Sequence, residues 1–169
     1  MNSELFDRLG APDRMLQIAG YDITDARLHE RLDAIAQRAA KLLEAPIALV
    51  SFVLDSSLYI AGSHGISGWV AQAQGMPAEW SMCTQAVLNG RPYCIGDGRA
   101  DPLHADNPLL EMTKLRSYLG VPLIDGSGQA LGAHCVMDVR PRMFGTVDIA
   151  VLSDGAQEVL AILAEHRVR

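Results

Sequence analysis

The segment from residue 115 to residue 138, LRSYLGVPLIDGSGQALGAHCVMD, limits the possible folds of this chain more than any other. Two strand-like runs flank residues 125–129, DGSGQ. These residue types favour a turn, because Gly adopts positive φ and the Asp side chain bonds to its own backbone. Side chains in each run alternate between two faces, as they do in a half-buried β-strand. The pattern predicts an antiparallel hairpin.

The register of this hairpin decides which side chains share a face. If Ile124 pairs with Ala130, Gly120 lies opposite His134. The aliphatic face then holds Leu119, Val121, Leu123, Leu131, Ala133, Cys135 and Met137. The other face holds Arg116, Tyr118, Gly120 and His134. One face therefore suits a hydrophobic core, and the other is expected to form the floor of a polar-lined cavity.

Length and charge limit the class of protein. With 169 residues, the chain is long enough for one domain with its own core. The net charge of −6 argues against nucleic acid or an anionic membrane as a partner. Three cysteines without paired spacing predict no disulfide framework, and no His, Cys or carboxylate set has zinc spacing. The opening residues show no secretory signal, and no run approaches the roughly 18 apolar residues of a membrane span. We therefore expect a cytoplasmic protein.

The first third of the chain predicts an arm, a helix and two strands. Short apolar clusters broken by glycine and proline indicate a loosely helical arm over residues 1–23. Thr24 then caps a helix from Asp25 to about Glu44, whose apolar positions recur at steps of three and four. Two strands follow, over residues 47–54 and 58–66.

The remainder alternates loops with short elements before a last long helix. Residues 69–78 are expected to be irregular. The elements predicted after them are a helix over 82–89 capped by Ser81, a strand over 92–95, a long loop with a short helix near 108–112, the hairpin, and a helix over 147–167. The fold class is therefore α+β: an antiparallel sheet of five to six strands, with terminal helices on one face. Loops and short helices are expected to cover the other face and enclose a ligand.

The ordered set of segments "APIALVSFV", "SMCTQAVLNGRPYCIGDGRADPLHADNP", "LRSYLGVPL" and "ALGAHCVMDVRPRMF" resembles a GAF domain. The chain is similar to the branch found beside bacterial histidine kinases and cyclic-dinucleotide enzymes. The resemblance covers Thr24 to Leu163 and implies a GAF-like sensory domain over residues 24–169. GAF domains are sensory modules whose terminal helices often dimerise, and their ligands vary widely, so the family implies the fold and not the ligand.

Motifs of known GAF subfamilies argue against several classes of ligand but do not identify the ligand. The Asn-Lys…Phe…Asp-Glu signature of cyclic-nucleotide GAF domains is absent, and no cysteine stands in the Cys-His pair typical of bilin attachment. Residues 111–114 contain no histidine where haem-binding GAF sensors place their axial ligand. Free methionine sulfoxide reductases carry a cysteine where Cys83 stands, but residues 103–106 replace their catalytic cysteine. No cofactor is therefore assigned.

Cys83 is the first candidate for binding or reactivity. It occupies the second position of a predicted helix, where exposed amides and the helix dipole favour a thiolate. The alternative is a small buried apolar residue, which is the usual role of a free cysteine. Cys94 approaches Cys83 only if its strand folds back along that helix, and a disulfide needs a Cα separation that the sequence does not give. Cys135 falls on the aliphatic face and is expected to pack in the core.

Five further residues are candidate ligand contacts: His104, Asp106, Arg116, Tyr118 and His134. His104 and Asp106 lie in the long loop, either as polar anchors above the cavity or as braces of the loop itself. His134 replaces the leucine usual in similar GAF sequences. It either lines the cavity beside Tyr118 or pairs with Tyr118 or a loop carbonyl.

These observations lead to one functional hypothesis with two alternatives. We expect a cytoplasmic GAF sensor, not an enzyme, that binds an unidentified small polar or planar molecule or responds to redox state through Cys83. It would signal by repacking its terminal helices, as a homodimer, to a signalling-protein partner. One alternative is a thiol enzyme resembling free methionine sulfoxide reductase that uses Cys83 and Cys94. The other is a ligand-free dimerisation scaffold.

Overall fold

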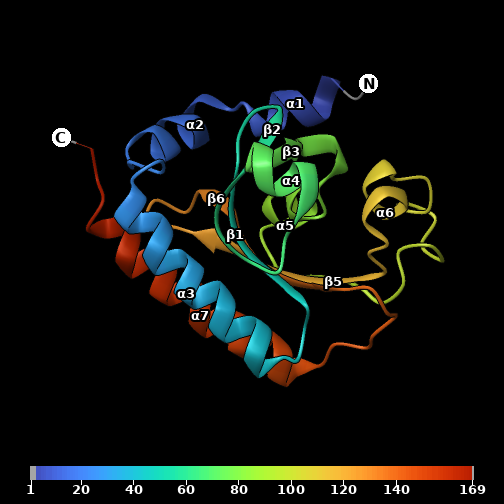
Figure 1. The fold of residues 1–169 in the computed structure, drawn as a ribbon. Helices are drawn as coiled ribbons and strands as arrows, with labels where there is room; N and C mark the ends of the chain where they lie inside the picture. The colour runs from blue at the N-terminus through green and yellow to red at the C-terminus, as the bar shows by residue number, and fades with distance from the viewer. Residues whose placement is uncertain (1–2, 169) are drawn as a thin grey trace.

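A six-stranded antiparallel sheet forms the centre of the protein, in the order β3-β2-β1-β6-β5-β4. The strands are β1 Ile47–Val53, β2 Ser57–His64, β3 Gly75–Pro77, β4 Tyr93–Ile95, β5 Ser117–Ile124 and β6 Ala130–Asp138. This computed structural model describes residues 3–168 (Figure 1), so residues 1, 2 and 169 of the expected arm and domain lie outside it. The predicted α+β class is confirmed.

Helices cover the two faces of the sheet differently. Their bounds are α1 Ser3–Leu9, α2 Pro12–Ala19, α3 Ala26–Leu42, α4 Gly68–Ala73, α5 Cys83–Asn89, α6 Pro108–Thr113 and α7 Thr146–Ala164, with a 3₁₀ turn, η1, at Ala78–Trp80. The long helices α3 and α7 lie side by side on one face, and α4, α5 and α6 lie on the other (Figure 1). We call the face of the sheet covered by α3 and α7 the helix face, and the opposite face the loop face. Within residues 3–168, no helix is both long and apolar enough to cross a membrane.

Helix α3 begins where its cap satisfies the first free amides. Asp25, not Thr24, is the N-cap, and its carboxylate accepts hydrogen bonds from the amides of Arg27 and Leu28 at 2.7 and 3.3 Å. Thr24 instead donates its hydroxyl hydrogen bond to Asp22. Most of the apolar stripe predicted for this helix is buried against β1 and β2, but Leu42 at its end is exposed.

Close packing between α3 and β2 depends on a glycine. A Cβ placed on Gly62 would lie 2.6 Å from both the carbonyl carbon and the Cβ of Leu32. The backbone of the helix therefore rests almost directly on the backbone of the strand. A β-bulge in β2 occurs at the same point, because Val50 pairs with Gly62 whereas Ser51 pairs with Ile60.

The predicted register of the β5–β6 hairpin is correct only next to the turn. Ile124 pairs with Ala130 as expected, but Leu123 pairs with Gly132, so one residue of β6 is left unpaired. This bulge moves every later pair by one position, and His134 lies opposite Val121 instead of Gly120. Beyond the bulge, the predicted faces of β6 are therefore exchanged. His134 points to the helix face, whereas Ala133, Cys135 and Met137 belong to the loop-face core.

Arg14 attaches α1 and α2 to the end of the sheet. Its buried guanidinium donates to the carbonyl of Leu9 through Nε and Nη2, at 2.9 and 2.7 Å. The same group donates to the carbonyls of Ala130 and Leu54, each at 3.1 Å. Residues at the tip of the β5–β6 hairpin, at the end of β1 and at the end of α1 are thus joined by one side chain.

A second attachment joins the segments before α3 and after α7. Tyr21 and Arg167 form an isolated antiparallel bridge, and the amide of Asp22 donates to the carbonyl of His166 at 2.8 Å. The guanidinium of Arg167 also lies 4.7 Å above the centre of the Tyr21 ring. The start of α3 and the end of α7 are consequently held together.

Residues 69–78, which we expected to be irregular, lie within a segment that contains α4, edge strand β3 and η1. Strand β3 pairs with β2 through residues 75–77, although it contains a proline, which edge strands tolerate. Trp69 and Trp80 meet edge to face with ring centres 6.2 Å apart. This segment forms part of the covering of the loop face.

Candidate functional site

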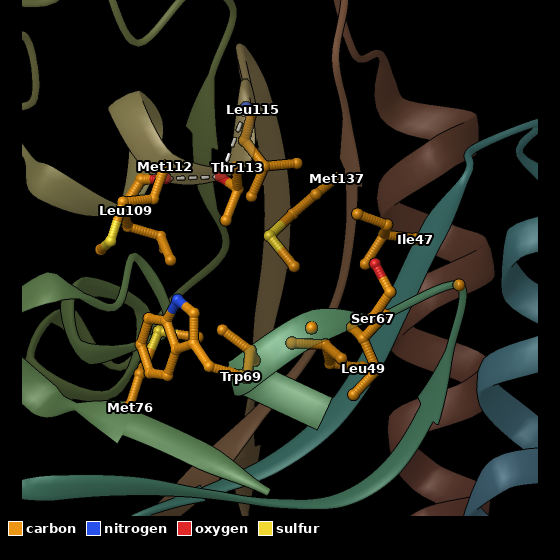
Figure 2. A pocket seen from close by; sticks show the side chains of 14 residues that line it. Ile47, Leu49, Ser67, Trp69, Met76, Leu109, Met112, Thr113, Leu115 and Met137 are labelled. Carbon is orange, nitrogen blue, oxygen red and sulfur yellow. Dashed lines mark hydrogen bonds between the residues drawn. The ribbon is translucent and has the colours of Figure 1, made fainter. Parts of the chain in front are cut away.

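A cavity of about 280 Å³ lies on the loop face between the sheet, α4 and α6 (Figure 2). Its floor comes from the sheet, where Ile47 pairs with Met137 and Leu49 follows on the same side of β1. Strand alternation places these three side chains on one face while their neighbours enter the helix-face core. The cavity is therefore built on the two central strands.

Aromatic and sulfur-containing side chains form the walls of this cavity. Trp69 of α4 and Met112 of α6 stand at its mouth, and they are 40 % and 49 % exposed. Met76 and Leu115 are buried deeper, and Figure 2 shows these side chains around the open space. Methionine adapts to ligands of irregular shape because its side chain is flexible and polarisable.

The polar groups of the cavity are few and uncharged. Ser67 and Thr113 contribute hydroxyls, but the Thr113 hydroxyl donates to the carbonyl of Leu109. No charged side chain belongs to the described lining. The site therefore suits a small neutral molecule that is mainly apolar or aromatic, with at most a few hydrogen-bonding groups.

Arg116, which we expected on a polar cavity floor, forms an ion pair away from the cavity. Its Nε and Nη2 donate to the two carboxylate oxygens of Asp97 at 2.8 and 2.7 Å. The hydrogen bond from Arg116 lowers the pKa of Asp97 below its usual value. The amide of Gly98 also donates to the carbonyl of Arg116, so this residue anchors the loop after β4 to the start of β5.

Tyr118 lies within the loop-face core, beside Cys83 and Cys135. Its side chain is fully buried, and burial raises the pKa of its hydroxyl well above the ordinary value. The hydroxyl makes no hydrogen bond of normal geometry in the described structure. A buried hydroxyl without a partner is costly, so Tyr118 is a chemically unusual part of this core.

His104 and Asp106 lie in the loop that covers α5, outside the cavity. His104 is buried and its Nε2 lies 2.6 Å from the hydroxyl of Tyr93. Asp106 is exposed beside a separate shallow hollow that His104 also lines. Asn107, which follows, caps α6 and donates to the carbonyl of Trp80 at 2.9 Å. This geometry agrees with the bracing alternative for the loop.

His134 lies on the helix face, away from Tyr118 and the cavity. Its Nδ1 is 3.0 Å from the carbonyl of Leu49, which indicates an Nδ1–H donor. Its Nε2 makes no hydrogen bond in the described structure. A Cβ on Gly155 of α7 would lie 2.8 Å from that nitrogen, so glycine is what allows α7 to pass over the imidazole.

The cysteines do not pair as the reductase hypothesis requires. Cys94 lies opposite Leu119 in the β4–β5 pairing, and Leu119 belongs to the helix-face core. Cys83 is in the loop-face core, so the sheet separates the two residues. Cys135 is the neighbour of Cys83, with the two Sγ atoms 3.8 Å apart.

The six predicted site residues are thus brought together only in part. Cys83 and Tyr118 are close, but none of the six lines the cavity. The residues that do line it, such as Trp69 and Met76, were missed. Their only signal in the sequence is the alternation that puts Ile47 and Leu49 on one face of β1, and apolar residues in such a pattern look the same as core.

The two buried histidines predict a loss of stability in mild acid. Burial lowers the pKa of both His104 and His134, and for His134 this effect outweighs the hydrogen bond to Leu49, which raises the pKa. Below an unfolded-state pKa of about 6.5, the unfolded chain therefore binds more protons than the folded chain. The free energy of unfolding should fall as pH drops through 6.5 towards the folded-state values, by up to about 1.4 kcal/mol per pH unit for each histidine.

Urea denaturation at pH 7.5, 6.5 and 5.5 measures this effect. The His104→Gln variant should show a smaller fall than the original chain over this range. Exposed His64 offers the matched control, His64→Gln. In this variant the free energy of unfolding should fall with pH as steeply as in the original chain. Equal slopes for all three proteins would contradict the prediction.

Comparison with known proteins agrees with the architecture. The GAF domain family matches residues 27–166. A cyclic di-GMP phosphodiesterase of Pseudomonas aeruginosa is 30 % identical over 134 residues, which are 78 % of this chain and 22 % of that protein. The chain thus spans about a fifth of the length of this relative.

Solved structures of low sequence identity share the fold. The GAF domain of a phosphoenolpyruvate-protein phosphotransferase from Coxiella burnetii aligns with a TM-score of 0.68 at 18 % identity, over 92 % of this chain and 96 % of that one. A free methionine-R-sulfoxide reductase from Neisseria meningitidis aligns with a TM-score of 0.65 at 20 % identity, over 97 % and 92 %. Together with the match over most of its length, the sheet and its two helical layers establish that this chain belongs to the GAF domain family.

Proposed function

We propose that this chain is a sensory or regulatory module that binds a small, neutral, mainly apolar molecule in the loop-face cavity. The observation that carries the proposal is a partly enclosed space of about 280 Å³ whose described lining has no charge. Transfer of a ligand into it is favoured by roughly 25 cal/mol per Å² of apolar surface removed from water. Of the polar or planar ligand expected from sequence, the proposal keeps a planar molecule and replaces the polar one with a more apolar one.

A continuous set of contacts leads from the cavity to the long helices. Met137 on the cavity floor is followed by Asp138, whose buried carboxylate accepts from Nη1 of Arg142 at 3.3 Å. Nη2 of Arg142 donates to the carbonyl of Leu43, just after α3, at 2.8 Å. A cation placed there also stabilises the C-terminal end of the helix dipole. Movement of Met137 by a ligand is therefore expected to shift the end of α3.

The proposed output is a change in how α3 and α7 pack, transmitted through a homodimer or to a signalling partner in the cytoplasm. Apolar side chains on these helices remain exposed, among them Leu42 and Val147. The regulated partner of the proposal is a catalytic signalling domain, in keeping with the phosphodiesterase named above, of which this chain matches only one part. We propose binding and not catalysis, since Cys83 and Cys94 lie on opposite faces of the sheet.

Titration with indole, a small neutral aromatic molecule, tests the proposal. Calorimetry should give saturable binding to the full chain. The Met112→Trp variant places a larger side chain at the cavity mouth and should weaken binding at least tenfold. Leu103→Trp is the matched control, because Leu103 is an exposed apolar residue that does not line the cavity.

Hydrogen exchange on the same samples tests the transmission step. Saturating indole should slow amide exchange near the end of α3 and the start of α7. Absence of saturable binding, or equal binding by both tryptophan variants, would overturn the ligand proposal. Binding without any change in these two helices would overturn the signalling route.

A further inference from the structure

We propose that Cys83 and Cys135 are a modification site: a buried dithiol that hydrogen peroxide oxidises to an intramolecular disulfide. This goes beyond the proposed function, since it does not depend on what the cavity binds. The site joins the start of α5 to the middle of β6, two segments 52 positions apart in the chain. Their Sγ atoms are already 3.8 Å apart, so a bond requires only a small approach.

The surroundings of the two thiols are polar within an otherwise apolar core. The Ser81 hydroxyl accepts a hydrogen bond from the amide of Cys83 at 3.1 Å, and the Ser51 and Tyr118 hydroxyls also lie beside the thiols. The hydroxyl of Tyr118 has no partner of normal geometry in the described structure. When Cys83 ionises, that hydroxyl gains an acceptor, so the cluster is arranged to stabilise a thiolate.

The same contacts make the two cysteines unequal. A hydrogen bond from Cys135 lowers the pKa of Cys83 to about 7, and the coupling raises the pKa of Cys135 well above the ordinary value. Cys83 is therefore the thiol that ionises first and attacks an oxidant, while Cys135 stays protonated and resolves the product.

The reaction balances in two steps. The Cys83 thiolate attacks one peroxide oxygen, the O–O bond breaks, and the departing hydroxide takes up a proton to leave as water. The resulting sulfenic acid is attacked by the sulfur of Cys135, which forms the S–S bond and releases a second water. In total, two thiols lose two electrons and two protons, and one hydrogen peroxide is reduced to two waters.

Access to the buried pair comes from local opening of α5. This helix has only seven residues. Short elements of this kind open more readily than the central strands. Once formed, the disulfide would fix α5 to β6 and remove this freedom.

Peroxide treatment of the native full chain carrying Cys94→Ser tests the inference. This background keeps both buried thiols and removes the exposed cysteine on the other face. After an acid quench and alkylation in denaturant at neutral pH with excess alkylating agent, mass spectrometry should show a loss of 2 Da, no alkylation, and full reversal by dithiothreitol. The double variants Cys83→Ser with Cys94→Ser and Cys135→Ser with Cys94→Ser should not lose 2 Da.

Other products would overturn the proposal. Addition of 32 Da with Cys135 still alkylated would mean that Cys83 overoxidises without a resolving partner. Full alkylation of both cysteines after native treatment, with a disulfide formed only in denaturant, would mean that the folded protein does not use the pair. Circular dichroism of each variant verifies that the folded state is the one tested.

Discussion

The Gly62→Ala variant is expected to lose about 3 kcal/mol of its free energy of unfolding, which is large for one methyl group. The new Cβ would lie 2.6 Å from the carbonyl carbon and from the Cβ of Leu32. Backbone atoms cannot rotate away as a side chain can, so α3 must shift relative to β2. Because α3 packs against both β1 and β2, the shift would disturb the helix-face core as a whole.

Urea denaturation monitored by circular dichroism measures this loss. Gly126→Ala is the matched control, because a Cβ there meets no atom within 4 Å and the substitution is the same. The control should stay within about 0.5 kcal/mol of the original chain. Similar midpoints for the two variants would show that α3 and β2 are less closely packed than described.

The Arg14→Met variant is expected to lose a similar amount, about 3 kcal/mol. Methionine keeps much of the apolar volume but cannot donate to the carbonyls of Leu9, Leu54 and Ala130. Hydrogen bonds to a charged group contribute about 1.5 to 3 kcal/mol, and buried carbonyls left without donors add a penalty. The attachment of α1 and α2 to the sheet should loosen first.

Two measurements distinguish the loss of the Arg14 hydrogen bonds from the effect of removing any positive charge. Arg8→Met removes an exposed arginine whose one hydrogen bond in the described structure is to the carbonyl of Leu88, and it should cost less than 1 kcal/mol. Limited proteolysis should release a peptide from residues 3–19 faster in Arg14→Met than in Arg8→Met. Equal stability and equal cleavage would contradict the role assigned to Arg14.

The sequence predicted the long helices and the sheet because their signals are local. Apolar steps of three and four along α3 and the turn residues at 125–129 act over a few positions, and both agree with the structure. The bulge beside the hairpin turn has no such signal. No residue type marks Leu131 as unpaired, so one extra residue reversed the predicted faces of His134 and Cys135.

The site was harder to predict than the fold for a different reason. Its lining comes from β1, β3, β6, α4, α6 and neighbouring loop residues, and most of it is apolar, so no single segment differs from ordinary core. The closeness of Cys83 to Cys135 likewise depends on how α5 lies on β6. The prediction relied instead on charged and polar residues, and one of these, Arg116, forms an ion pair with Asp97 and does not line the cavity.

The bridge between Tyr21 and Arg167 has a consequence for the geometry of signalling. It joins the start of α3 to the end of α7, while Arg142 binds the carbonyl of Leu43 at the opposite end of the pair. With both ends pinned, the two helices cannot open like scissors without breaking one attachment. In the signalling route proposed above, we therefore expect a ligand to rotate the two helices about their long axes and not to move them apart.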